Sequence, residues 1–329
     1  MPPALICVVS LALIFDFLNG VHGSSNIVGT MISSRAFRPR VALWITATAE
    51  FTGPFLFGVA VARTIGSEIV KSNVITLNIL LACLIGSILW NLLTWFLGLP
   101  SSSSHGLVGG LIGAAWVGAG LNSLLLPGLI KTFAALFAAP LLGFGLGFLL
   151  TRLIYLLAAN TSPRINGFFK NGQIVTALIL ATSHGANDAQ KTMGVIVLAL
   201  VISDRLSGFN VPLWVITISA AGMALGTLLA GWRLIRTVGT KFYKIRPVHS
   251  FSAQLTSAVV LLGSSLLGWP VSATHVVSSA IIGVGSSERL GKIRWGVASE
   301  IVVAWVLTIP ASALLSAGAY WLITNPARF

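Results

Sequence analysis

The sequence predicts an all-α polytopic membrane protein that consists of two inverted-topology repeats with discontinuous helices and re-entrant hairpins. Of its 329 residues, 56% are hydrophobic and only 8% are Asp, Glu, Lys or Arg, whereas soluble domains carry roughly 25% charged residues. Residues 72–130 and 247–287 contain no Asp, Glu, Lys or Arg, and about 20 apolar residues suffice for one membrane crossing. This composition excludes a soluble enzyme and a disordered chain.

The apolar segments follow one another in an order that occurs twice. The first half is expected to contain a helix at 4–34 with a polar interruption at 19–26, a helix at 41–62, two legs at 73–97 and 101–118 joined at Gly98-Leu99-Pro100, and a long helix at 126–157. The second half is expected to contain 172–200 with an interruption, 211–232, two legs at 251–268 and 271–286, and 295–323. The predicted boundaries are 1–158 for the first transmembrane repeat, 159–171 for a cytoplasmic linker and 172–329 for the second, inverted transmembrane repeat.

Two motifs support this repeat. Gly20–Gly29 aligns with Gly185–Gly194 at an offset of 165 residues, and the Pro-Ser-rich stretch that ends at His105 aligns with the one that ends at His275 at an offset of 170. Two separate motifs that recur in the same order at nearly one offset indicate an internal repeat.

The distribution of basic residues predicts the orientation in the membrane. If the paired legs are re-entrant, each half crosses three times, so the second half is inverted relative to the first. The segments 35–40, 152–170, 233–246 and 289–294 then share one face and hold 14 Lys or Arg residues, against 4 on the other face. Basic loops lie at the negatively charged cytoplasmic face. We therefore expect a plasma-membrane protein with both termini outside, and the net charge of +13 is assigned to lipid contact and not to nucleic acid.

The two Pro-Ser/Thr stretches each start a helix and carry hydroxyl groups. Free backbone N–H groups at a helix start bind anions, and Ser or Thr next to Pro can cap the helix. Inverted repeats would bring the two starts face to face as an uncharged cradle for a tetrahedral oxyanion. The hydroxyl donors of this predicted anion site are Ser102, Ser103, Ser104, Ser272 and Thr274. The alternative is that they serve helix packing in the membrane.

Charged and amide residues in two apolar segments predict a cation site. Asp188 lies between Asn187 and Gln190, and a buried carboxylate beside amides is suited to hold a cation or to carry a proton. The alternative is a structural pair of Asp188 with Lys191, three residues further on. Glu50 is a second intramembrane carboxylate, for which a packing role remains an alternative.

The aligned first-half residues are His22, Gly23, Ser24, Ser25 and Asn26. Gly23 stands where the second half has Asp188, so the predicted site is electrically asymmetric. The sequence has no Walker-type phosphate loop and no zinc-ligand spacing. It also lacks a nucleophile–base pair at a recognisable spacing. We therefore expect a transporter, not an enzyme, with no cofactor and no metal beyond a possible sodium ion at Asp188.

At these residues the sequence resembles the inorganic phosphate transporter family. The resemblance is carried by the segments 16–26, 183–194 and 305–310 and by the two Pro-Ser/Thr-His stretches, and it covers nearly the whole chain. It implies a homodimeric phosphate symporter driven by sodium or protons. The family usually has Asp after the first-half His, where this sequence has Gly23.

The resemblance also implies which residues line the site. Asn26, Asn187 and Gln190 are predicted to bind phosphate together with the hairpin hydroxyl groups, and the coupling cation is assigned to Asp188, Asn19, Ser25 and Glu50. Two other functions remain open, namely a permease for another oxyanion such as sulfate and a passive anion channel.

Overall fold

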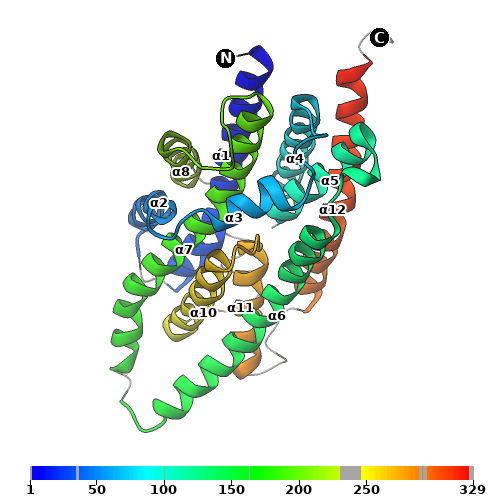
Figure 1. Cartoon of the computed structure of the whole chain (residues 1–329). Coiled ribbons are helices and arrows are strands. Elements are labelled where there is room, and N and C mark those ends of the chain that lie inside the picture. Colours follow the sequence, from blue (N-terminus) through cyan, green and yellow to red (C-terminus); the bar gives the residue numbers. More distant parts are fainter. Residues whose placement is uncertain are drawn as a thin grey trace.

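The computed structural model describes residues 2–34, 37–99, 101–162, 164–229, 246–288, 291 and 295–325. The side chains of Ser24, Ser25, Asn26 and Val297 lie outside the described part. The regular elements are helices, which Figure 1 shows, and their bounds are α1 Pro3–Ser33, α2 Pro39–Leu56, α3 Ala60–Arg63, η1 Thr64–Glu68, α4 Leu77–Leu97, α5 Ser103–Ala119, η2 Leu121–Ser123, α6 Leu126–Leu157, α7 Ile165–Ile202, α8 Leu213–Leu228, α10 Pro247–Leu266, α11 Ala273–Glu288 and α12 Trp295–Thr324.

The helices have the length and the surface of membrane-spanning segments. Within the described residues, α1, α4, α6 and α12 are long and apolar enough to cross a membrane, and α2 with α3 and η1 adds a fifth span if this bent pair counts as one. The outer surface carries large apolar side chains, such as Leu141 and Leu314, which are each 74% exposed. Buried groups include many polar and charged side chains, which is the expected arrangement in lipid. The predicted fold class is confirmed.

The path of the chain agrees with an odd number of crossings in each half. The start of α1 and the end of α12 lie at the same end of the molecule, and the turn between α6 and α7 lies at the opposite end (Figure 1). The boundaries of the two repeats stay a prediction. Pro100 and most of the basic residues at 233–246 and 289–294 lie outside the described residues.

The two predicted hairpins, α4–α5 and α10–α11, turn in the same way. Helix α4 ends at Gly98 with φ +68°, and α10 ends close to Gly268 with φ +67°. Leu99 N donates to Thr94 O at 2.9 Å, and Trp269 N donates to Ser264 O at 2.8 Å. Only glycine adopts this left-handed conformation at little cost, so the same helix end recurs 170 residues later.

The two halves interlock through helix contacts that recur when the first half is aligned with the second. Helix α1 packs on α8 and α7 packs on α2, while α5 packs on α12 and α11 packs on α6. A Cβ atom on Gly20 would come within 2.1 Å of Met223 O, and one on Gly185 would come within 2.1 Å of Glu50 O. Glycine is thus required at both aligned positions because the backbone of a neighbouring helix lies where a side chain would be.

Three details differ from the prediction. The polar stretch 19–26 does not interrupt α1, and α7 runs unbroken from Ile165, within the predicted linker, to Ile202. The described discontinuities lie at the hairpin tips and after α2, where the predicted helix 41–62 bends by 73° into α3 and η1. Pro54 in the last turn of α2 and Gly58 at φ +76° account for this bend.

Candidate functional site

The tips of the two hairpins meet inside the protein. The rings of His105 and His275 lie 4.3 Å apart between their centroids. Ser104 Oγ donates a hydrogen bond to Val271 O at 3.1 Å, so the start of α5 contacts the segment that leads into α11. The two starts of helices that the sequence places in different halves therefore lie face to face.

Both helix starts are capped by the aligned serine. Ser102 Oγ accepts from His105 N at 3.1 Å, and Ser272 Oγ accepts from His275 N at 3.3 Å. Ser103 Oγ donates to Asn19 Oδ1 at 2.5 Å, which ties the first tip to α1. The five hydroxyl-bearing residues predicted to bind phosphate are all buried. The structure brings these side chains together, and their binding of phosphate stays a prediction.

A charged cluster on α7 lies directly beside the two tips. Lys191 Nζ donates to Asp188 Oδ1, to Ser104 Oγ at 2.5 Å and to Val271 O at 2.7 Å. The two charged side chains are buried, Asp188 with 3% and Lys191 with 1% of its surface exposed. The structural Asp188–Lys191 pair that the sequence offered as an alternative is present, but its ammonium group also joins the tips of both hairpins.

The cluster continues from Asp188 to α2. His184 Nδ1 donates to Glu50 Oε1 at 2.7 Å, and His184 Nε2 lies 3.2 Å from Asp188 Oδ2. Thr227 Oγ1 of α8 donates to the other oxygen of Glu50 at 2.5 Å. Asp16 of α1 lies close enough to interact electrostatically with Asp188 and Lys191. Buried charges in a membrane segment are costly unless they are paired, and here an unbroken series of pairs runs from α2 to the hairpins.

No role is predicted for His184 from the sequence. The sequence feature that could have pointed to His184 is Gly23, which has no side chain. A Cβ atom on Gly23 would lie 2.2 Å from His184 Cε1. The ring thus occupies the space that a first-half side chain would need. Glu50, predicted as a coupling residue, is the partner of this ring.

Two predicted phosphate ligands have other partners in the structure. Gln190 Oε1 accepts from Val61 N at 2.8 Å, and its Nε2 donates to Gly58 O at 2.6 Å, so the side chain holds the start of α3. Its amide therefore stabilises the bend after α2, and its predicted binding of phosphate stays a prediction. Asn187 Nδ2 donates to Trp269 O at 3.3 Å and Ser265 Oγ at 3.2 Å, which ties α7 to the second hairpin.

Three predicted site residues remain, and the structure describes the side chain of one of them, Asn19. Asn19 lies at the first tip, where it accepts from Ser103. The side chains of Ser25 and Asn26 lie outside the described residues, so their predicted roles stay predictions.

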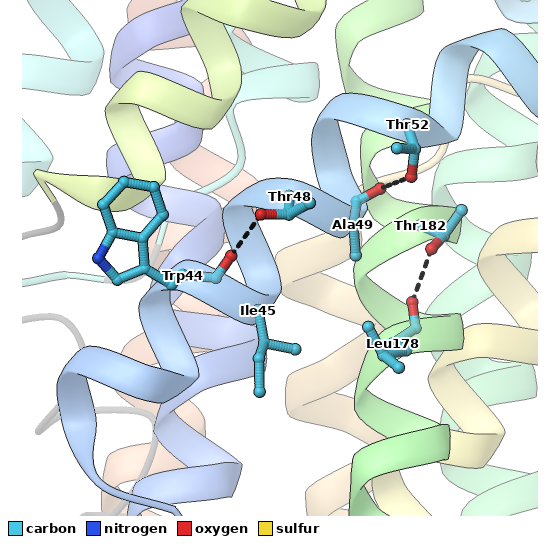
Figure 2. Close-up of a pocket in the computed structure, with 7 residues that line it drawn as sticks. All are labelled: Trp44, Ile45, Thr48, Ala49, Thr52, Leu178 and Thr182. Atoms are coloured by element: carbon cyan, nitrogen blue, oxygen red, sulfur yellow. Dashed lines mark hydrogen bonds between the residues drawn. The ribbon is translucent and has the colours of Figure 1, made fainter.

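An open pocket between α2 and α7 does not have the chemistry of an anion site. Figure 2 shows this pocket of about 440 Å³, which is lined by Trp44, Ile45, Thr48, Ala49, Thr52, Leu178 and Thr182. The three threonine hydroxyl groups donate to carbonyl groups of their own helices (Figure 2). Trp44 is 65% exposed. Hydroxyl groups bonded within a helix at an apolar surface are typical of a lipid-facing groove.

Paired re-entrant helix tips beside a buried charged cluster define a membrane transport protein of the type that holds its cargo between two repeats. The chain belongs to the phosphate transporter family, because the model of that family matches residues 19–316.

Relatives and a solved structure agree with this assignment. The chain is 43% identical to a probable low-affinity inorganic phosphate transporter of Rhizobium meliloti, with 97% of this chain and 96% of the relative covered. It is 42% identical to a protein of the same description from Bacillus subtilis, with the same coverage. The structure of a sodium-dependent phosphate transporter superposes with a TM-score of 0.90 at 25% identity and covers 98% of this chain and 99% of that chain. The family consists of transporters, so the expectation that the protein is not an enzyme is confirmed.

Proposed function

We propose that the protein is a symporter that moves inorganic phosphate across the plasma membrane together with a sodium ion or a proton. The observation that carries the proposal is the contact between the two capped helix tips, Ser104 to Val271, next to the buried Asp188. Family membership supports phosphate as the substrate. The sodium dependence of the structural neighbour supports a cation as the driving partner.

The proposed phosphate site uses backbone N–H groups and hydroxyl groups. Two helix starts point their free N–H groups and positive dipole ends at one anion, so no net charge is needed on the protein side. Ser103, Ser104 and Thr274 add hydroxyl donors close to these starts. Because the tips are buried and bonded to each other, phosphate reaches them only after the surrounding helices move to open a path. Movement of one half against the other would open the site to either side in turn.

The coupling cation is proposed to bind among the oxygen atoms beside this cradle. Asp188, Glu50 and the Asn19 carbonyl group supply such atoms in three helices, with Ser25 as a further predicted ligand. A cation there would lower the electrostatic cost of bringing an anion into a buried site.

Uptake of radiolabelled phosphate into proteoliposomes tests the proposal, with a sodium gradient and a proton gradient imposed separately. We expect accumulation above the equilibrium level with at least one of the two gradients. Equal uptake with and without both gradients would contradict the coupling and would instead support a passive anion channel.

Sulfate is the second substrate to be tested. An uncharged cradle of N–H and hydroxyl groups also suits sulfate, whereas phosphate in its protonated form can in addition donate a hydrogen bond to a carboxylate such as Asp188. We expect that excess sulfate leaves phosphate uptake unchanged. Competition by sulfate at equal concentration would assign the site to oxyanions in general.

The assembly and the orientation are also proposals. The resemblance to the family supports a homodimer in the lipid bilayer, and the 14 basic residues on one face support termini outside the cell. Protease access to a tag at each terminus in intact cells tests the orientation, and light scattering of the purified protein tests the dimer.

A further inference from the structure

Lys191 is a buried cation whose charged group lies at the junction of three elements. It is among the largest fully buried side chains of the described chain, with 1% of its surface exposed. Its ammonium group contacts Asp188 on α7, Ser104 at the start of α5 and Val271 before the start of α11. A lysine that serves only its own helix would need the first of these contacts alone.

The partners of Lys191 are the oxygen types that bind sodium in transporters. Asp188 supplies a carboxylate oxygen, Ser104 a hydroxyl oxygen and Val271 a carbonyl oxygen from an unwound segment. Unwound carbonyl groups and half-helix ends coordinate sodium in transporters with discontinuous helices. The ammonium group therefore lies in a cage of oxygen atoms from both halves that has the composition of a cation site.

The hydrogen-bond capacity of the ammonium group argues against a direct role in phosphate binding. An ammonium group has three donors and no acceptor, and the three contacts to oxygen account for all of them. Phosphate could bind to Lys191 only if one of these bonds were given up. A cation that stays in the cage keeps all three.

The charges around the cage favour a single cation. Asp188 neutralises Lys191, and His184 on α7 already has Glu50 of α2 as a partner. Asp16 of α1 interacts electrostatically with both members of the Asp188–Lys191 pair. Across the tips, His105 of α5 and His275 of α11 face the same region. A sodium ion added beside Lys191 would place two positive charges next to one carboxylate in a buried site, which is strongly unfavourable.

We propose that the ammonium group of Lys191 is a tethered cation that occupies a sodium site between Asp188 and the two hairpin tips, so that sodium does not bind there in this protein. The inference rests on the proposed cation-coupled transport and moves its coupling cation away from Asp188. In the first half, Asn26 stands at the position aligned with Lys191, so only one of the two repeats carries this cation.

Binding of radiolabelled sodium to the purified full-length protein tests the inference. Lys191→Met removes the charge, keeps much of the apolar stem and leaves Asp188 without its ammonium partner. Sodium binding to Lys191→Met is expected to be at least ~10-fold stronger than to the wild type, because a buried carboxylate that has lost the cation in its cage attracts another one. Lys191→Arg keeps the charge and is expected to match the wild type. The double variant Lys191→Met/Asp188→Asn lacks the carboxylate and is expected to lose the gain.

Equal sodium binding by the wild type and Lys191→Met would overturn the inference, whether the shared affinity is high or low. A gain in Lys191→Met that persists in the double variant would also overturn it, because the new ion would then bind elsewhere. If Lys191→Met is poorly folded, its recovery as a monodisperse protein is compared in sodium and in choline buffer. Rescue by sodium alone supports the inference, and equally poor recovery in both overturns it.

These results are separate from the test of the proposed function. A wild-type protein that fails to accumulate phosphate would contradict symport and would leave the comparison of sodium binding intact. Conversely, unchanged sodium binding in Lys191→Met would remove the role of Lys191 while phosphate uptake by the wild type remained.

Discussion

The middle of α1 and the middle of α7 share a backbone arrangement but differ in charge. Each helix has a glycine, Gly20 or Gly185, pressed against the backbone of a helix from the other half. Three residues after these glycines, α1 has Gly23 and α7 has Asp188. The charged groups near the hairpin tips thus come largely from the second half.

The difference shows how one half compensates for the other. His184 extends into the space left by Gly23, and its ring reaches Glu50 of α2. Glu50 in turn occupies the place, against Gly185, that Met223 occupies against Gly20. A carboxylate of the first half, Glu50 on α2, is thus held by a histidine of the second half whose ring fills the space at Gly23. Backbone symmetry is kept while the charge becomes asymmetric.

The largest effect is expected at Asp188, the charged residue that α7 has where α1 has Gly23. In Asp188→Asn, phosphate accumulation in proteoliposomes is expected to fall at least ~100-fold, because the ammonium group of Lys191 beside the two tips loses the carboxylate that neutralises it. The amide keeps the shape of the side chain, so we expect the variant to elute as a folded protein. Asp204→Asn makes the same chemical change at an exposed loop position and serves as the control. Wild-type accumulation by Asp188→Asn would show that the charge difference between the two motifs has no role in transport.

The compensation between Gly23 and His184 is tested by a double-mutant cycle. Gly23→Ala is expected to lower the free energy of unfolding by about 1–3 kcal/mol, because the new methyl group overlaps the imidazole ring. In a His184→Ala background, the same change is expected to cost close to nothing. Unfolding midpoints of the four proteins in detergent give the coupling energy, for which about 0.5–3 kcal/mol is typical of residues in contact. Additive effects would mean that the ring does not fill the space at Gly23.

A smaller effect is expected where the two halves match. Ser102 and Ser272 both cap a helix, and loss of such a cap costs about 1 kcal/mol. Ser102 Oγ also lies 2.7 Å from His105 Nδ1, so Ser102→Ala should destabilise more than Ser272→Ala. Thermal unfolding measures both, with the Ser→Thr change at each position as a control that retains the cap. A larger loss in Ser272→Ala would contradict the added contribution of the contact between Ser102 and His105.

The features that the sequence predicts correctly are those encoded by local backbone requirements. Gly98-Leu99-Pro100 and its counterpart at Gly268 demand a turn, so both hairpins could be located. The bend after Leu56 could also have been found, because Pro54 and Gly58 stand there. The continuous α1 was not predictable from its polar stretch, since polar side chains keep a helix intact when other helices satisfy them.

The partners in the site could not be read from the sequence, because they depend on tertiary contacts. Lys191 and Val271 are 80 residues apart, and their contact requires the second hairpin to fold back onto α7. Gln190 lies next to Lys191 in the chain and yet holds the start of α3, since successive helical residues point in different directions. The spacing of a motif therefore identifies a functional region but not the partner of each side chain.

The smallest effect is expected at an ion pair that the first half does contain. Lys131 Nζ lies 2.8 Å from Glu68 Oε2, and the two side chains are 32% and 36% exposed, unlike those of Asp188 and Lys191. Exposed pairs contribute about 0–1 kcal/mol and are screened by salt. Glu68→Gln is therefore expected to shift the unfolding midpoint slightly at low salt and not at high salt, with phosphate uptake unchanged. A loss of uptake comparable to that of Asp188→Asn would show that charge in the first half is as essential as charge in the second.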